Sequence, residues 1–226
     1  MTITIYPITD EFVAEVGDID LSKPLDRDDE RAVKAAFWKY AVLIFPEQQL
    51  SAQQHIDFAR LFGPIEADRV LSPERSGGRL DPGFSDISNL DRTGRIWGEN
   101  SRERMYKAGN RLWHTDSSFK RRPGLCSLLY AHTVVPIGGH TEFADQRAAY
   151  DALPPGGAFI VVEALIDDAR RENVFGLLMS LNMLIEFGEA FDYSAADFEA
   201  WCRNVGFSRF EVIQLAGPSS AAIAYK

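Results

Sequence analysis

A cluster of turn-forming residues, Pro154-Pro155-Gly156-Gly157, divides the chain into two stretches with different secondary-structure patterns. Before this cluster, short strands, helices and a long loop follow one another, a pattern that favours an α+β fold leaning to a β-sandwich. After it, an apolar strand is followed by two helices and two strands, an order typical of α/β proteins. The sequence therefore predicts two parts, residues 1–153 and 154–226, with the junction near Ala152-Leu153-Pro154.

The first part contains two well-marked helices among short strands. The helix expected at 28–40 has an apolar stripe, and Ser51 is a suitable N-cap for a helix at 51–62. The stripe of the first helix is Val33, Ala36, Phe37 and Tyr40, and the core-facing residues of the second are Ala52, Ile56, Ala59 and Phe62. Strands are expected at 2–6, 41–45, 84–90 and 126–135, a loop that could select a substrate at 69–109, and a further helix at 145–153.

The second part begins with a nearly continuous apolar run at 158–165, typical of a strand buried on both faces of a parallel sheet. A helix at 168–187 follows, and Ser194 with Asp197 forms the capping box of a helix that Gly206 ends. Strands at 210–215 and 221–225 close the chain. The helical residues 174–184 are apolar on almost every side, so we expect exposed apolar surface and association, which leaves a homo-oligomer open.

Composition narrows the class of partner. The chain has 226 residues and a formal net charge of -9, which disfavours a nucleic-acid binder because such proteins need a basic face. A small-molecule substrate is expected instead. The longest apolar run, 174–185, is too short to span a membrane, and the first ten residues do not resemble a signal peptide. The two cysteines form no CxxC motif, which indicates a reducing, cytoplasmic setting.

His114 and Asp116 are the strongest candidates for chemistry. Residues two apart in an extended chain lie on the same side, so this imidazole and this carboxylate can hold one metal ion together. Two histidines and one carboxylate on one face of an iron ion are the ligand set of non-haem iron oxygenases. An isolated HxD pattern is more often a pair of surface polar residues, and the surrounding segment 112–119 is what favours the metal-binding interpretation.

Residues 1–153 resemble the TauD/TfdA family of iron(II)/2-oxoglutarate dioxygenases, more closely on its dichlorophenoxyacetate branch than on its taurine branch. The stretches that carry this resemblance are 17–21, 41–45, 58–66 and 87–89, and the most telling are 112–119, which contains His114 and Asp116, and 138–145, which contains Thr141. The resemblance implies an incomplete double-stranded β-helix (jelly roll) with N-terminal helices. It also implies Fe(II) at His114 and Asp116, 2-oxoglutarate held by Thr141, and hydroxylation of a small anionic organic substrate.

The resemblance breaks down at the last iron ligand. The family requires a second histidine far downstream of Asp116, followed by an arginine for 2-oxoglutarate, but no histidine follows position 140. The four histidines are His55, His114, His132 and His140. His140 is the better substitute ligand, whereas His55 and His132 are expected to be structural. We therefore expect an incomplete site with inefficient turnover.

Residues 152–226 resemble the C-terminal end of an S-adenosylmethionine-dependent O-methyltransferase. The resemblance rests on 153–163, 177–183, Tyr193-Ser194 and Val205-Gly206-Phe207. It implies an α/β methyltransferase-like fragment with a closing β-hairpin. Since no glycine-rich cofactor loop is present, two alternatives to the dioxygenase interpretation remain: a non-catalytic chimera that associates, and a methyltransferase fragment that acts with a complementary chain.

Overall fold

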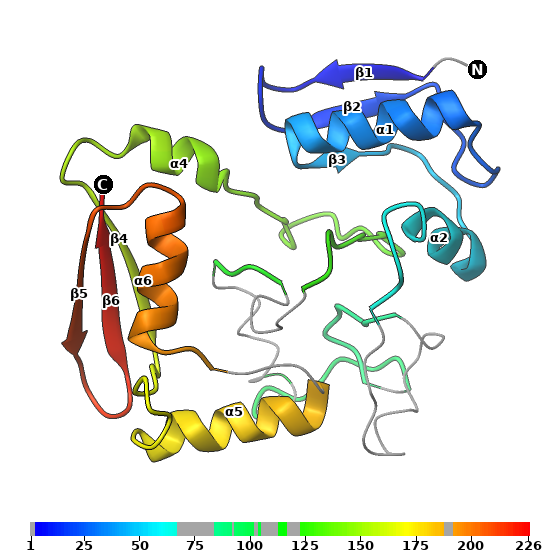
Figure 1. Cartoon of the computed structure of the whole chain (residues 1–226). Helices are drawn as coiled ribbons and strands as arrows, with labels where there is room; N and C mark the ends of the chain where they lie inside the picture. The colour runs from blue at the N-terminus through cyan, green and yellow to red at the C-terminus, as the bar shows by residue number, and fades with distance from the viewer. Residues whose placement is uncertain are drawn as a thin grey trace. The chain divides into compact units, whose positions relative to one another are not determined.

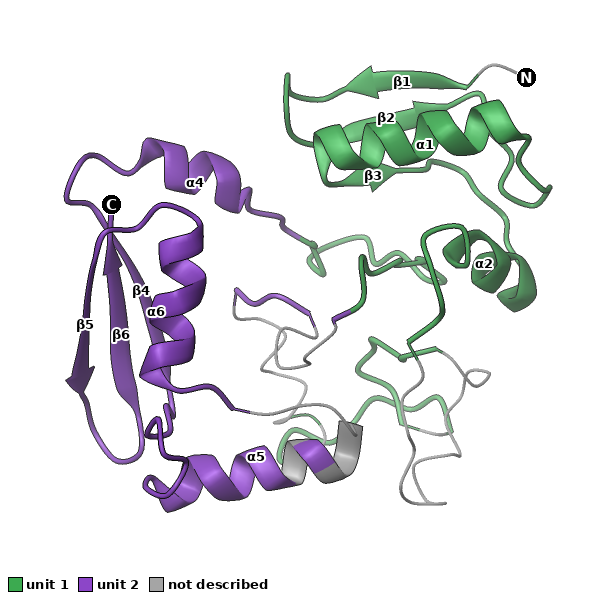
Figure 2. Cartoon of the chain, in the orientation of Figure 1, with its two compact units in different colours: residues 1–67, 77–112, 124–141 green, residues 68–76, 113–123, 142–226 purple. Residues whose placement is uncertain are grey.

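The computed structural model describes residues 3–66, 84–91, 93–101, 104, 113–116, 123–187 and 192–226 (Figure 1). The chain forms two compact units (Figure 2): residues 1–67, 77–112 and 124–141 make the first, and residues 68–76, 113–123 and 142–226 make the second. Much of the predicted substrate loop at 69–109 lies outside the described residues. None of the described helices is long and apolar enough to cross a membrane.

The elements that the structure describes in the first unit include a three-stranded sheet and the helices α1 and α2. Strand β1 (Thr4–Pro7) pairs antiparallel with β2 (Ala14–Gly17), and β2 pairs parallel with the two-residue β3 (Leu43–Ile44). Helix α1 (Arg27–Tyr40) lies beside this sheet in Figure 1, and α2 (Ala52–Ala59) follows it. The main core of the unit consists of the buried side chains of Ile3, Val16, Leu21, Val33 and Phe58.

Helix α1 confirms the prediction made for residues 28–40. The Asp26 carboxylate accepts hydrogen bonds from the N–H groups of Asp28 and Asp29, which satisfies two free donors of the first turn. The predicted stripe is largely confirmed, because Val33, Ala36 and Tyr40 are buried and Phe37 is half-buried. The buried residues are three or four positions apart, so they lie on one face of the helix.

Helix α2 confirms the cap at Ser51, but the predicted core face is wrong in part. Ser51 forms a capping box with Gln54, whereas Ala52 is exposed and Phe58 is the buried residue. The Phe58 ring contacts the rings of Phe45 and Phe62, with centroids 5.2 and 5.7 Å away. An aromatic ring buries far more apolar surface than an alanine methyl, so the helix turns this ring towards the core.

Three predicted strands of the first unit are shorter than expected or not formed. The strand at 41–45 is reduced to β3, and the segments 84–90 and 126–135 have no strand, apart from an isolated bridge between Leu90 and Ile96. Half-buried residues still alternate with exposed ones from Cys126 to Tyr130. This segment therefore has the pattern of a strand but has no ladder partner among the described residues. The jelly roll is accordingly not confirmed.

In the second unit, the described residues form a three-stranded antiparallel sheet and three helices. Its strands are β4 (Ala158–Glu163), β5 (Arg209–Gln214) and β6 (Ser220–Tyr225), in the order β4-β6-β5. Its helices are α4 (Gln146–Ala152), α5 (Val174–Phe187) and α6 (Ala195–Asn204). The predicted closing hairpin and the helix at 145–153 are confirmed. The sequence junction at 153/154 stays a prediction, since compactness in space does not locate a join.

The prediction of a buried parallel strand at 158–165 is wrong. Among the residues that the structure describes, strand β4 pairs with β6 alone, and that pairing is antiparallel. Ile160 and Val162 are exposed, whereas the central strand β6 is buried from Ser220 to Ala224. A run of apolar residues indicates a strand, but it does not state which neighbours cover that strand.

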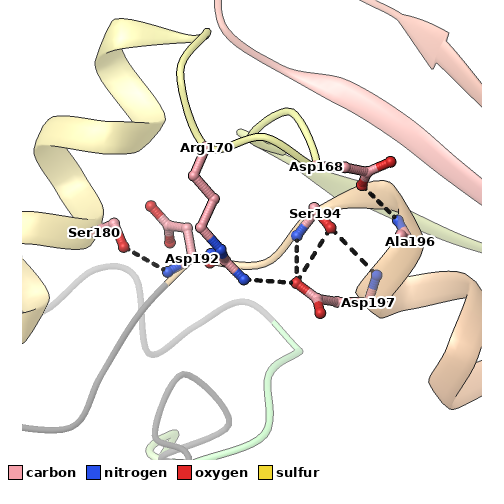
Figure 3. A network of polar contacts seen from close by, with 7 residues as sticks. All are labelled: Asp168, Arg170, Ser180, Asp192, Ser194, Ala196 and Asp197. Atoms are coloured by element: carbon pink, nitrogen blue, oxygen red, sulfur yellow. Dashed lines mark hydrogen bonds and ion pairs between the residues drawn. The ribbon is translucent and has the colours of Figure 1, made fainter.

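Helix α6 packs on the sheet through the buried side chains of Phe198 and Cys202, which join Leu165, Phe207, Ala222 and Ala224 in one core. Its capping box is confirmed: Ser194 Oγ accepts from the Asp197 N–H at 3.3 Å, and the Ser194 N–H donates to Asp197 Oδ2 at 3.0 Å (Figure 3). The predicted stop is consistent too, since Gly206 has a φ of 104°.

Helix α5 begins six residues later than predicted. Asp167 Oδ1 accepts from the N–H groups of Arg171 and Glu172, which holds this stretch in a turn. Asn173 then donates from Nδ2 to the carbonyls of Leu165 and Pro218. The expected exposure of the apolar helix is confirmed, and the exposed side chains include Val174, Phe175, Leu178, Met179, Leu181 and Leu184.

Candidate functional site

His114 and Asp116 lie side by side in the second unit. His114 Nε2 is 3.2 Å from Asp116 Oδ1, and the two side chains are 47% and 59% exposed. Two donors that bind one metal at right angles at about 2.1 Å lie about 3.0 Å apart. The pair therefore has a separation at which both atoms can bind one ion, and its exposure leaves access for further ligands.

Thr141 is exposed in an irregular segment that follows Gly138 and Gly139. Both glycines have positive φ angles, 78° and 69°, so the chain makes here the turn that the sequence predicts. Thr141 belongs to the first unit, whereas His114 and Asp116 belong to the second. A joint site of these three residues therefore stays a prediction.

The described residues place no third protein ligand beside the His114–Asp116 pair. Among them, no group of three His, Cys, Asp or Glu side chains is arranged to hold a metal ion. His140 is exposed. His55 and His132 instead contact the ring of Tyr130, at centroid distances of 5.8 and 4.8 Å. The Tyr130 hydroxyl accepts from the Leu50 N–H and donates to the Gln48 carbonyl. This agrees with a structural role for His55 and His132.

His55 lies in a cluster with the rings of Tyr130, His132 and Phe84, and these neighbours affect its protonation. Burial, and secondarily the charge of His132, lower the pKa of His55 below the usual value for histidine. A neutral imidazole is thus favoured at this position in the folded protein.

A polar group that the sequence does not predict lies between α5 and α6 (Figure 3). Asp192 Oδ2 is buried and has no hydrogen-bond partner among the described residues, while the Asp192 N–H donates to Ser180 Oγ at 3.0 Å. Burial, and then the charge of Glu163, raise the pKa of Asp192. Burial also raises the pKa of Tyr193 to about 12, again with Glu163 contributing. Glu163 is recognisable as the end of a strand, but nothing local pairs it with Asp192.

Arg170 connects the start of this network to helix α6. Its guanidinium donates to Asp197 Oδ2 at 3.0 Å and to the Asp192 carbonyl at 3.1 Å. Asp168 Oδ1 accepts from the Ala196 N–H at 3.1 Å. These contacts hold the turn that precedes α5 against the first turn of α6, so their effect is structural.

Comparison with known proteins identifies the first part. Residues 4–157 match the family model of the taurine catabolism dioxygenase TauD, TfdA family. The chain belongs to the TauD/TfdA family. It is 40% identical over 154 residues to the alpha-ketoglutarate-dependent 2,4-dichlorophenoxyacetate dioxygenase of Cupriavidus pinatubonensis, covering 68% of this chain and 54% of that protein. The chain thus spans about half the length of this dioxygenase.

A solved structure gives the same result for this TauD/TfdA member. The crystal structure of AAD-2, in complex with Mn(II) and N-oxalylglycine, aligns with a TM-score of 0.63 and 44% identity. The alignment covers 68% of this chain and 54% of that chain. The resemblance inferred from the sequence motifs is therefore confirmed.

The second part matches a different family. Residues 146–208 match the family model of the O-methyltransferase domain. The tetracenomycin polyketide synthesis 8-O-methyl transferase TcmO of Streptomyces glaucescens is 39% identical over 77 residues, which are 34% of this chain and 23% of that protein. The methyltransferase resemblance is also confirmed. Both family matches include residues 146–157, the stretch around the predicted junction.

Proposed function

We propose that this protein is of the iron(II)- and 2-oxoglutarate-dependent dioxygenase type, with an incomplete site and inefficient turnover. The observation that carries the proposal is the family match over residues 4–157, which contains the His114–Asp116 pair at 3.2 Å. The proposed substrate is a small organic anion. Its class is suggested by relatives whose names refer to 2,4-dichlorophenoxyacetate and (S)-phenoxypropionate. A phenoxyalkanoate is therefore the first compound to test.

The residues present suit the proposed cofactors in part. His114 and Asp116 would hold the metal ion, and the Thr141 hydroxyl would donate to a carboxylate oxygen of 2-oxoglutarate. When bound, iron(II) and 2-oxoglutarate supply O₂-dependent hydroxylation. We propose that the distal histidine of the family has no counterpart here, because no histidine follows residue 140. Two protein ligands hold a metal ion less firmly than three, so we expect the ion to bind weakly and to exchange readily with the solution.

The test is an anaerobic titration of the full chain with Fe(II) in the presence of 2-oxoglutarate. The signal is the visible charge-transfer band of 2-oxoglutarate chelated to iron. The chain offers a matched control, since Asp57 is exposed to nearly the same extent as Asp116, at 57%. We expect the band in the wild type and in Asp57→Ala, and its loss in Asp116→Ala. An identical band in Asp116→Ala, or no band in any of the three, would contradict the proposal.

A first alternative is a non-catalytic chimera that associates through apolar surface. The exposed apolar side chains of α5 favour it. Far-UV circular dichroism and size exclusion test it, because a cooperative melt with a sharp monomer peak would argue against it. In this alternative, we propose that the two parts join at 153/154 and that the protein forms a homo-oligomer. Separately, we propose a reducing, cytoplasmic setting, in which Cys126 and Cys202 stay free thiols.

A second alternative is a methyltransferase fragment that acts with a complementary chain. The match of residues 146–208 to the O-methyltransferase domain favours it. Equilibrium dialysis with labelled S-adenosylmethionine, with and without the missing portion of such a domain, tests this idea. Absence of binding in both arms would dismiss it.

A further inference from the structure

The edge of the second unit's sheet at β4 is open. Within the part of the chain that the structure describes, β4 has a strand partner on one side only, because the strand order is β4-β6-β5. An edge strand presents a row of unpaired N–H and C=O groups that can pair with another chain. Strand β4 therefore has the backbone requirements for pairing with an additional strand.

The two edges of this sheet differ in their protection. Strand β5 carries Arg209 and Glu211. The Arg209 guanidinium lies over the ring of Tyr225, 3.5 Å from its centroid, and Glu211 accepts from the Tyr225 hydroxyl. Charged residues on an edge strand discourage pairing with another strand. From Ala158 to Val162, strand β4 has neither a charged residue nor a proline. Of the two edges, β4 is thus the unprotected one.

The side chains of β4 divide between the two faces of the sheet. Val161 packs against the core below α6, and the Phe159 ring stacks on Phe198 with centroids 6.3 Å apart. Ile160 and Val162 point to the other face and are exposed. Because a strand alternates its side chains, a partner strand must preserve this division between the faces.

A second copy of β4 satisfies that condition. In an antiparallel pair about a two-fold axis through Ile160, this residue lies opposite its own copy and Ala158 lies opposite Val162 of the other chain. Phe159 lies opposite Val161, on the face that α6 covers, and Glu163 lies opposite Gly157. Opposed pairs on each face are then free of like charges, which would destabilise the pairing. The strand is self-complementary in this register.

We propose that the protein self-associates by antiparallel pairing of β4 with β4 of a second copy, which gives one six-stranded sheet. This deepens the association alternative above and is independent of the metal site. The pairing closes at two chains because β5 forms both outer edges. A six-residue edge buries less than the about 1,200–2,000 Å² of a stable interface, so the dimer forms and dissociates readily with concentration.

Sedimentation velocity of the full chain over about a hundredfold range of concentration around the micromolar level tests this. Ile160→Lys places a charge at the centre of the proposed pair. Ile213→Lys is the matched control: it lies on the same face but on β5, and both isoleucines are about half exposed, at 56% and 47%. Leu178→Lys tests the exposed face of α5, and a thermal melt of each variant verifies folding.

We expect the wild type, Ile213→Lys and Leu178→Lys to approach twice the chain mass of 25.3 kDa as concentration rises. For Ile160→Lys we expect a dissociation constant at least about tenfold higher. A wild type that stays monomeric overturns the proposal, as does association that Ile160→Lys leaves unchanged. If only Leu178→Lys loses association, the contact lies on α5. If only Ile213→Lys loses it, the contact lies on β5. Either result contradicts the pairing through β4. Growth beyond two chains would exclude the closed pair.

Discussion

Replacement of Phe198 by alanine is the most direct test of how the second unit is held together. Phe198 is 4% exposed and packs between α6 and the sheet, in the same core as Leu165 and Ala222. Truncation of a buried phenylalanine to alanine lowers the unfolding free energy by about 3–5 kcal/mol, because less apolar surface is buried on folding and a cavity remains. Typical domains have only about 5–15 kcal/mol of unfolding free energy, and small ones lie at the lower end. The substitution should therefore remove a large part of this unit's stability.

Urea unfolding followed by tryptophan fluorescence measures this loss. Trp201 lies on α6, with its ring 5.2 Å from that of Tyr193, so its emission reports on this helix. The unfolding curve of a Trp201→Phe variant contains the signal of the other three tryptophans, so subtracting it leaves the signal of Trp201. With a urea dependence of about 1–3 kcal/mol per molar, the midpoint should fall by about 2 M. The control is Phe175→Ala on α5, the same substitution at an exposed position. Equal midpoint shifts in the two variants would refute the assigned packing.

Substitutions at three further positions have defined outcomes. Ser194→Ala removes the oxygen that accepts from the Asp197 N–H and should lower the unfolding free energy by about 1–2 kcal/mol in urea, whereas Ser194→Thr keeps the cap. Burial raises the pKa of Asp192, so the folded state binds the carboxyl proton more tightly than the unfolded state does. The unfolding free energy should therefore fall as pH rises from the usual carboxyl pKa through the raised one. Asp192→Asn should flatten that part of a plot of melting temperature against pH. Burial lowers the pKa of His55, so its contribution to stability should be complete above the ordinary histidine pKa and should disappear as pH falls through the lowered one. His55→Gln should abolish that acid-side loss, and an unchanged melting profile would contradict the assignment.

The candidate site was predictable to the extent that it is local. His114 and Asp116 are two residues apart, and a two-residue spacing in an extended segment is enough to bring an imidazole and a carboxylate to one side. In the structure the two side chains do lie together, with His114 Nε2 3.2 Å from Asp116 Oδ1. The relation of this pair to Thr141 depends on tertiary packing, because Thr141 lies 25 positions after Asp116 and the two residues fall in different units. The proximity of Glu163 to Asp192 also depends on packing, since these residues come from separate elements.

The sequence by itself determined that the helices and the closing hairpin exist and where two helices are capped, although it placed the start of α5 six residues too early. Ser51 with Gln54 and Ser194 with Asp197 form capping boxes within four consecutive residues, so no distant contact is needed. Only the tertiary structure decided which apolar segments pair as strands. Residues 126–135 and 158–165 both have the composition of a strand. Within the described parts of the chain, however, only the second finds a partner, in β6, and it lies at the edge of that sheet. The physical reason is that strand hydrogen bonds are made between segments, so a strand exists only where the fold supplies a neighbour.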